Sequence, residues 1–263
     1  MAPRARLRLT LLSGFALWRG SEQVPVTVGG QRLIALLALR DGPVGRLHVA
    51  ETLWPSCSAE RSLASLRTTL WRVSQTVEEV IVARPAVLGL AGGIDVDVRN
   101  LATASHRLNQ CRGPATIDLD AVSPADLVGE LLPDWYDDWL QEEREGLRQT
   151  RLHALERLAQ VLSAGGRHAD AIQAALAAIR LEPLRETAHR TLIEIHLAEG
   201  NWSEACRQYQ RCRRLLQDEL GVEPSDSMRL LLGSMPQLPE PVLPRIRHAP
   251  RRGLVNVSTR PDS

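Results

Sequence analysis

The feature that most constrains the fold is an internal repeat with a period of 34 residues in the second half of the chain. The strings GRHADA (166–171) and GNWSEA (200–205) align at that offset, and Leu158 aligns with Leu192. Each copy has a glycine at the expected turn between two helices and an alanine where two helices would press together. The sequence therefore predicts stacked pairs of antiparallel helices, each of which buries its apolar face against the next.

The period and the small residues are typical of tetratricopeptide repeats, and a plain helical bundle is the alternative. Pro183 ends the first copy, and Ala175 stands at a position where an aromatic residue is usual and where the second copy has Tyr209. Repeats of this kind bind protein segments or ligands on a concave face, or form dimer surfaces. Ahead of them we expect helices over 100–110 and about 135–164.

The first hundred residues predict a different architecture, with strands first, then three helices and then a hairpin. We expect strands at 7–12, 16–18 and 24–28, followed by a break at Gly29 and Gly30. Helices are expected at 31–40, 47–54 and about 61–77. A hairpin should then turn at Gly92 and Gly93. This order is that of a winged helix-turn-helix with a preceding sheet.

The predicted fold is thus an α+β N-terminal winged helix-turn-helix with a preceding β-sheet, followed by an all-α tetratricopeptide-like domain. We place the first domain at 1–98, the helical domain at 99–235 and a disordered, basic, proline-rich tail at 236–263. The formal charge follows this division, at +4 over 1–100, −6 over 101–235 and +3 over 236–263. A basic first part suits contact with a polyanion, and an acidic second part suits contact with protein.

Every basic residue other than histidine is arginine, because the chain contains no lysine. This excludes a P-loop phosphate contact and a Schiff base. The nine aromatic residues are too few for a platform that stacks single-stranded nucleic acid. We therefore expect no catalytic residues and no cofactor.

The cysteines and the N-terminus suggest two further sites, and we favour neither. Cys206, Cys212 and His196 could be imagined as metal ligands, but their spacing is not a usual zinc pattern, so buried helix residues are the better interpretation and no metal is expected. The arginines before Leu9 resemble the start of a signal peptide, but the alternation of leucine with polar residues favours a half-buried strand. We expect a cytoplasmic protein with reduced thiols and no membrane contact.

The third helix carries the residues best suited to contact DNA. Its apolar stripe should comprise Leu63, Leu66, Leu70, Val73 and Val77. The opposite face should present Arg61, Ser65, Thr68, Arg72 and Gln75. No acidic residue lies between Arg61 and Gln75, and arginine, glutamine and hydroxyl groups are the side chains that bond base edges in the major groove. The alternative is a solvated helix face, and Arg84 could reach the minor groove or a phosphate.

Three strings resemble the SARP family of bacterial antibiotic-pathway regulators. RSLASLRTTLWRV (61–73) resembles the recognition helix of that family. LLPDWYDDWLQEERE (131–145) and ELGVEPSDSMRLL (219–231) resemble strings of its bacterial transcriptional activator domain. The resemblance covers about residues 5–235 and implies an OmpR-like winged helix joined to that activator domain. Where the family usually has Gly-Tyr near the wing, this chain has Pro85 and Ala86, which puts minor-groove contacts in doubt.

The resemblance also implies the partners and the role. Members bind direct repeats in promoter DNA upstream of biosynthetic genes and recruit RNA polymerase holoenzyme, in some cases as a homodimer on DNA. The loop before the recognition helix, with Pro55, Ser56, Ser58 and Glu60, lies where the polymerase contact is expected. Larger relatives carry a P-loop domain, whose phosphate contact requires a lysine, and this chain contains no lysine. A tetratricopeptide-like protein adaptor and a ligand-gated repressor are the alternative functions.

Overall fold

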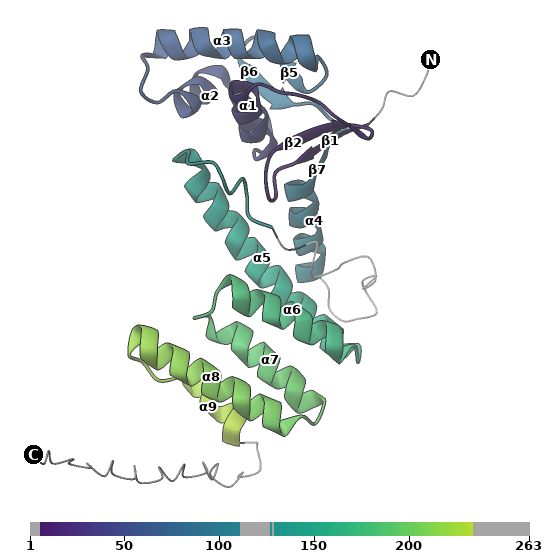
Figure 1. The fold of residues 1–263 in the computed structure, drawn as a ribbon, viewed down its shortest axis with the longest axis vertical. Coiled ribbons are helices and arrows are strands. Elements are labelled where there is room, and N and C mark those ends of the chain that lie inside the picture. Colours follow the sequence, from purple (N-terminus) through teal and green to yellow (C-terminus); the bar gives the residue numbers. More distant parts are fainter. Residues whose placement is uncertain (1–5, 111–126, 128, 234–263) are drawn as a thin grey trace, which may run out of the picture.

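The computed structural model describes residues 6–110, 127 and 129–233. These residues form an elongated molecule in which mixed strands and helices occupy one end and helices alone the other (Figure 1). Cys111 and the predicted tail at 236–263 lie outside the described residues. Among those that are described, no helix is both long and apolar enough to cross a lipid bilayer.

The chain begins with a small sheet in which the predicted alternation is confirmed. Leu7 and Leu9 are buried on one face, and Arg8 between them is exposed and lies over the ring of Trp18. The strand order is β3-β2-β1-β7; β1 pairs antiparallel with β2 and parallel with β7. The strands are β1 (Leu7–Thr10), β2 (Ala16–Arg19), β3 (Glu22–Gln23) and β7 (Asp95–Val96).

Three helices and a second sheet complete a winged helix, as the sequence predicted. Their shared core includes Leu33, Leu53, Leu66 and Leu88, all essentially inaccessible to solvent. The second sheet has the order β4-β6-β5, all antiparallel. The elements are α1 (Val28–Ala38), β4 (Val44–Gly45), α2 (Arg46–Leu53), α3 (Ala59–Thr76), β5 (Ile81–Ala83) and β6 (Val87–Leu90).

Two local predictions in this part were wrong around residues 22–30. The third strand is Glu22–Gln23, because residues 24–27 find no partner strand beyond one hydrogen bond from Val24 N to Leu17 O (2.8 Å). Gly29 and Gly30 do not break the chain but lie in the first turn of α1. A Cβ atom on Gly30 would stand 2.8 Å from Val73 Cγ2 on α3, so the glycine permits the close approach of the two helices.

The predicted hairpin turn at Gly92 and Gly93 was also wrong. The hairpin joins β5 to β6, and its turn is closed by a hydrogen bond from Arg84 N to Val87 O (2.9 Å). Gly93, with φ of +82°, instead redirects the chain out of the second sheet into β7 of the first. Alternating apolar residues indicated a strand correctly but could not indicate which sheet it joins.

The second part of the molecule is helical throughout. Its core is formed largely by small and branched apolar residues such as Ala171, Ala174, Ala178 and Leu192. The long helix begins at Trp139, four residues later than predicted. The elements are α4 (Asp97–Gln110), α5 (Trp139–Ala164), α6 (His168–Leu181), α7 (Glu186–Ala198), α8 (Trp202–Leu220) and α9 (Asp226–Gly233).

The repeat of 34 residues is confirmed in the backbone hydrogen bonds. Arg167 N donates to Leu162 O (2.9 Å), and Asn201 N donates to His196 O (2.8 Å), one period later. Gly166 and Gly200 hold matching positive φ angles of +76° and +80° at the two helix ends. The pairs α5–α6 and α7–α8 are therefore the two repeats, and they stack beside each other (Figure 1).

A buried histidine in the second repeat holds the loop that joins the two repeats. His189 Nε2 donates to Pro183 O (2.8 Å), so its Nδ1 is the acceptor for Gln208 Nε2 at 2.6 Å. Burial lowers the pKa of His189 below its ordinary value, because the charged imidazolium is poorly solvated there. The neutral ring thus joins the loop before α7 to α8.

The two parts of the molecule share a core rather than meeting through a free linker. Leu131 and Leu140 are buried in the same cluster as Leu9 of β1. Trp135 stacks on Phe15 with ring centroids 6.2 Å apart, and it lies before α5 rather than within it. Trp139 packs against the same core.

Polar groups fix this junction further. The Asp97 carboxylate at the start of α4 accepts hydrogen bonds from Leu11 N and Leu12 N at 2.9–3.0 Å. Ion pairs join Arg32 of α1 to Asp137 just before α5, and Arg40 just after α1 to Glu143 of α5. The additional pairing between 11–13 and 130–132 includes Leu132 N donating to Leu11 O (2.9 Å). The position of α1, and with it α3, is therefore coupled to the helical part.

Candidate nucleic-acid interface

The helix α3 is the candidate interface because it forms one end of the long axis of the molecule, away from the helical repeats (Figure 1). It begins after the N-cap Ser58, and the Ser62 hydroxyl donates to Ala59 O (3.0 Å) in its first turn. The buried side of the helix comprises Ser62, Leu66, Thr69 and Val73.

The structure leaves most of the predicted contact residues exposed, but the outward face is rotated from its predicted position. Arg61, Thr68, Arg72 and Gln75 are exposed, whereas Ser65 is half-buried. The face is rotated because Leu63 and Leu70 are only half-buried. Ser62 and Thr69 take their place in the core, and each lies four residues before a buried apolar residue of the same helix.

Two exposed residues on the outward side of α3 were missed by the sequence reasoning. Arg67 is exposed, and Trp71 keeps 62% of its surface exposed. The available signal was the spacing of Ser62, Leu66, Thr69 and Val73, which marks a stripe with small polar members. The sequence did not predict that stripe because its polar members were assumed to be exposed.

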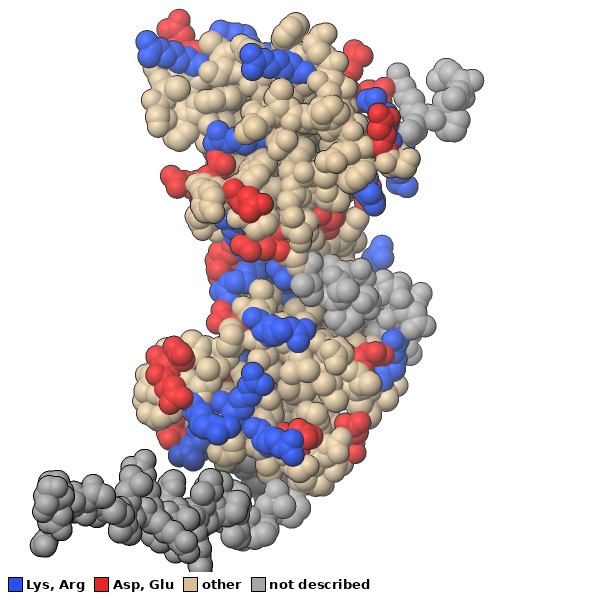
Figure 2. Space-filling view, viewed as in Figure 1, with Lys and Arg blue, Asp and Glu red and all other residues tan. Residues whose placement is uncertain are grey.

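The outward face carries positive charge from three arginines. Arg61, Arg67 and Arg72 form no ion pair with any carboxylate among the described residues. Figure 2 shows basic side chains along this end of the molecule, with acidic ones near the two ends of the helix. Unpaired guanidinium groups on a convex helix face are available to an external anion.

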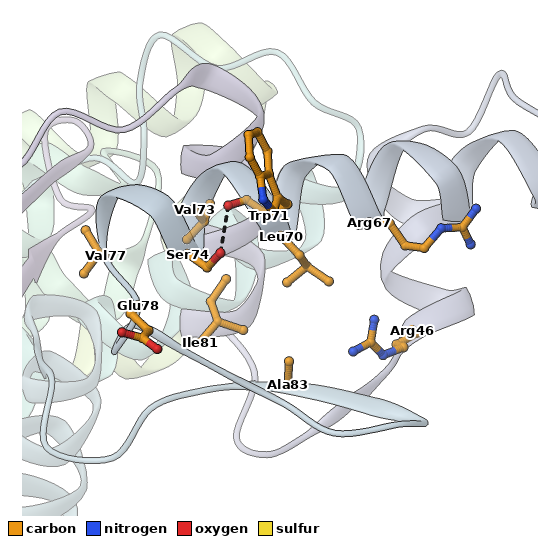
Figure 3. A pocket seen from close by; sticks show the side chains of 10 residues that line it. All are labelled: Arg46, Arg67, Leu70, Trp71, Val73, Ser74, Val77, Glu78, Ile81 and Ala83. Carbon is orange, nitrogen blue, oxygen red and sulfur yellow. Dashed lines mark hydrogen bonds between the residues drawn. The ribbon is translucent and has the colours of Figure 1, made fainter.

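A groove of about 330 Å³ runs between α3 and the hairpin β5–β6. Arg67 from α3 and Arg46 from the start of α2 line it, and Figure 3 shows their side chains at the same end of the groove. Leu70 and Ile81 form its apolar floor. The ring of Trp71 stands on the outer side of the helix, away from the hairpin (Figure 3).

The hairpin adds Arg84 at its tip, where the side chain is exposed. Its carbonyl accepts a hydrogen bond from Arg46 Nε at 3.0 Å, which ties the hairpin to α2. The terminal nitrogens of Arg46 remain directed to the groove (Figure 3). Arg46 therefore belongs with the candidate residues, although the sequence reasoning did not select it.

The loop between α2 and α3 lies beside this face. Pro55, Ser56 and Ser58 are exposed, and Glu60 is exposed in the first turn of α3. One hydrogen bond from Cys57 N to Trp54 O (3.1 Å) shapes the loop. These exposed side chains can contact a partner protein next to a molecule that is bound at α3.

The cysteines considered as metal ligands do not assemble a site within the described residues. No group of three histidine, cysteine, aspartate or glutamate side chains there could hold a metal ion. Cys212 is buried in the core between α8 and its neighbours, and burial raises the pKa of its thiol to about 11. Cys212 thus packs as a small apolar side chain.

The fold defines a class of protein, one that joins a winged helix to a helical-repeat domain. Residues 100–233 match the family described as "Bacterial transcriptional activator domain". The chain therefore belongs to the bacterial transcriptional activator domain family, and its resemblance to the SARP regulators is confirmed.

Similar proteins span both parts of the chain. It is 31% identical to Regulatory protein AfsR of Streptomyces coelicolor over 235 residues, which is 86% of this chain and 24% of AfsR. It is 25% identical over 212 residues to Transcriptional regulator RedD of the same organism, covering 75% of this chain and 61% of RedD. The chain thus spans about a quarter of the length of AfsR.

A solved structure has the same fold. Mycobacterium tuberculosis EmbR, determined in complex with a low-affinity phosphopeptide, matches with a TM-score of 0.70 and 21% sequence identity. The match covers 86% of this chain and 64% of the EmbR chain. It therefore supports the order of a winged helix followed by helical repeats.

Proposed function

We propose that this protein is a sequence-specific DNA-binding transcriptional activator of a secondary-metabolite gene cluster, which binds direct repeats in promoter DNA and recruits RNA polymerase. The observation that carries the proposal is the outward face of α3, where Arg61, Arg67 and Arg72 form no ion pair with any of the described residues and no acidic residue lies between them in the sequence. A protein adaptor has no need of such a face.

The geometry assigns different DNA contacts to different residues. An α-helix fits the major groove, so α3 would present Thr68, Arg72 and Gln75 to base edges. Arg46 and Arg67, which line the groove between α3 and the hairpin, suit the phosphates of one strand. Arg84 at the hairpin tip suits a further phosphate or the adjacent minor groove.

The other parts of the proposal rest on family membership. Direct repeats on one face of DNA would place two protomers about one helical turn, roughly 10–11 bp, apart. The exposed loop with Pro55, Ser56, Ser58 and Glu60 would then face polymerase beside the bound DNA. We propose 1–98 as the DNA-binding domain and 99–235 as the activator domain, with the shared core around Leu131 holding both in one orientation.

The test is a salt titration of the full chain on duplex DNA from promoters of its own gene neighbourhood, with a scrambled duplex as control. We expect tight, sequence-dependent binding whose logarithm falls linearly with the logarithm of salt concentration, with a slope of about −0.9 for each phosphate contacted. Replacing Arg67 by Gln should reduce that slope by about one phosphate and weaken binding on both duplexes alike.

A matched control is Arg207→Gln, which removes an exposed arginine from α8 on the helical part. This variant should retain the slope of the unaltered protein. Equal affinity of the unaltered protein for the promoter and scrambled duplexes would reject sequence-specific recognition and favour the adaptor function. A promoter-fusion assay separates activator from repressor, because deletion of a repressor raises expression.

A further inference from the structure

The middle of the outward face of α3 is apolar, although its flanks are cationic. Ala64, Thr68 and Trp71 are exposed and lie about one helical turn apart, so they form a strip along the helix. We propose that this strip contacts the 5-methyl groups of thymine in the major groove, and that Trp71 is the residue that selects thymine. The inference rests on the proposed DNA-binding function.

The hydroxyl of Thr68 is occupied within the helix. Thr68 Oγ1 donates to Ala64 O at 3.1 Å, a bond between residues four apart that uses the hydroxyl hydrogen. Its methyl group then remains as the unengaged part of the side chain. Thr68 therefore adds to the apolar strip instead of offering a donor to a base.

Trp71 dominates the strip because of its size and exposure. With 62% of its surface exposed, it presents more apolar area than any other residue on this helix face. The ring stands clear of the groove floor formed by Leu70 and Ile81 (Figure 3). A large aromatic side chain placed this way gains free energy only if a partner covers it.

The major groove offers one apolar feature among its base edges, the 5-methyl group of thymine. Tryptophan has a single N–H donor and no acceptor, so it cannot match the donor of cytosine or the paired donor and acceptor of adenine. The flanking Arg67 and Arg72 would hold the helix against the phosphates and guanines on either side. The strip thus fits a thymine within the bound site.

The experiment uses the full chain and the duplex that it selects from a random-sequence library. That duplex is prepared once with thymidine and once with deoxyuridine, which lacks the methyl group, and both affinities are measured by fluorescence anisotropy. Loss of one buried methyl contact should weaken binding about fourfold. In Trp71→Ala the two duplexes should bind equally, and Trp71→Phe should keep most of the difference.

Tyr136→Ala is the matched control, because Tyr136 is an exposed aromatic residue that lies outside α3, and it should keep the full difference. If the unaltered protein binds both duplexes equally, or if Trp71→Ala keeps the difference, the assignment to Trp71 is overturned. If no duplex is enriched from the library, the proposed function itself fails and this inference fails with it.

Discussion

The packing of α1 against α3 makes a sharp prediction about two adjacent glycines. In Gly30→Ala the new methyl group would stand 2.8 Å from Val73 Cγ2 and 2.8 Å from Val26 Cγ1, closer than carbon atoms can approach. Val73 is buried in the core, so α3 must move to relieve the contact. In Gly29→Ala the methyl group would meet Thr69 Oγ1 at 3.6 Å, an ordinary contact.

The magnitudes follow from two opposing terms. Replacing glycine by alanine in a helix stabilises it by up to about 1 kcal/mol, and inserting a methyl group into a packed core costs about 1–3 kcal/mol. Gly29→Ala should therefore be neutral or stabilising by up to about 1 kcal/mol. Gly30→Ala should lose up to about 2 kcal/mol net, which in a protein of this size lowers the Tm by roughly 2–4 °C for each kcal/mol.

Thermal unfolding followed by circular dichroism measures both variants against the unaltered protein. The displacement of α3 in Gly30→Ala should also weaken DNA binding, whereas Gly29→Ala should leave it unchanged. A Tm for Gly30→Ala equal to or above that of Gly29→Ala would refute the inference that only glycine at position 30 leaves room for the Val73 side chain.

Further predictions concern DNA contact, pH and thiol reactivity. Arg72→Ala should cost about 1–3 kcal/mol on the cognate duplex alone if Arg72 bonds a base, and equal weakening on all duplexes would make it a phosphate contact. Because burial lowers the pKa of His189, the unfolded state binds more protons than the folded state below about pH 6.5, so stability should fall as the pH drops from there. His189→Gln should flatten that dependence in urea unfolding, and an unchanged pH dependence would exclude His189 as its source. Cys212, with a thiol pKa of about 11 and almost no exposed surface, should resist iodoacetamide at pH 8 until the protein unfolds, while the exposed Cys57 reacts in the native state. Native labelling of Cys212, mapped by mass spectrometry, would contradict its burial.

The sequence predicted the repeats and the winged helix because both are set by local signals. Gly166 and Gly200 mark identical helix ends, and the alternation of Leu7 with Arg8 and Leu9 marks a half-buried strand. The pairing of β7 with β1 could not be predicted in this way. Those strands lie more than eighty residues apart, and the same alternation suits either sheet.

The candidate interface was predicted less completely, for a physical reason. Ser62 and Thr69 are polar yet buried, and the Ser62 hydroxyl donates a hydrogen bond within its own helix turn. A helix wheel built on hydrophobicity alone therefore places the outward face too far from Arg67 and Trp71. Arg46 could not be found from the sequence, since the tertiary fold brings the start of α2 beside the hairpin, where Arg46 bonds Arg84 O and lines the groove.

The proposed function requires the outward face of α3 to recognise a specific DNA sequence. The most direct measurement compares the unaltered protein on its promoter duplex and on a scrambled duplex across a range of salt concentrations. We expect a preference for the promoter duplex that persists as the salt concentration rises, with a slope that reports several phosphate contacts. Equal affinities at every salt concentration would contradict it, because the arginines would then bind DNA by charge alone.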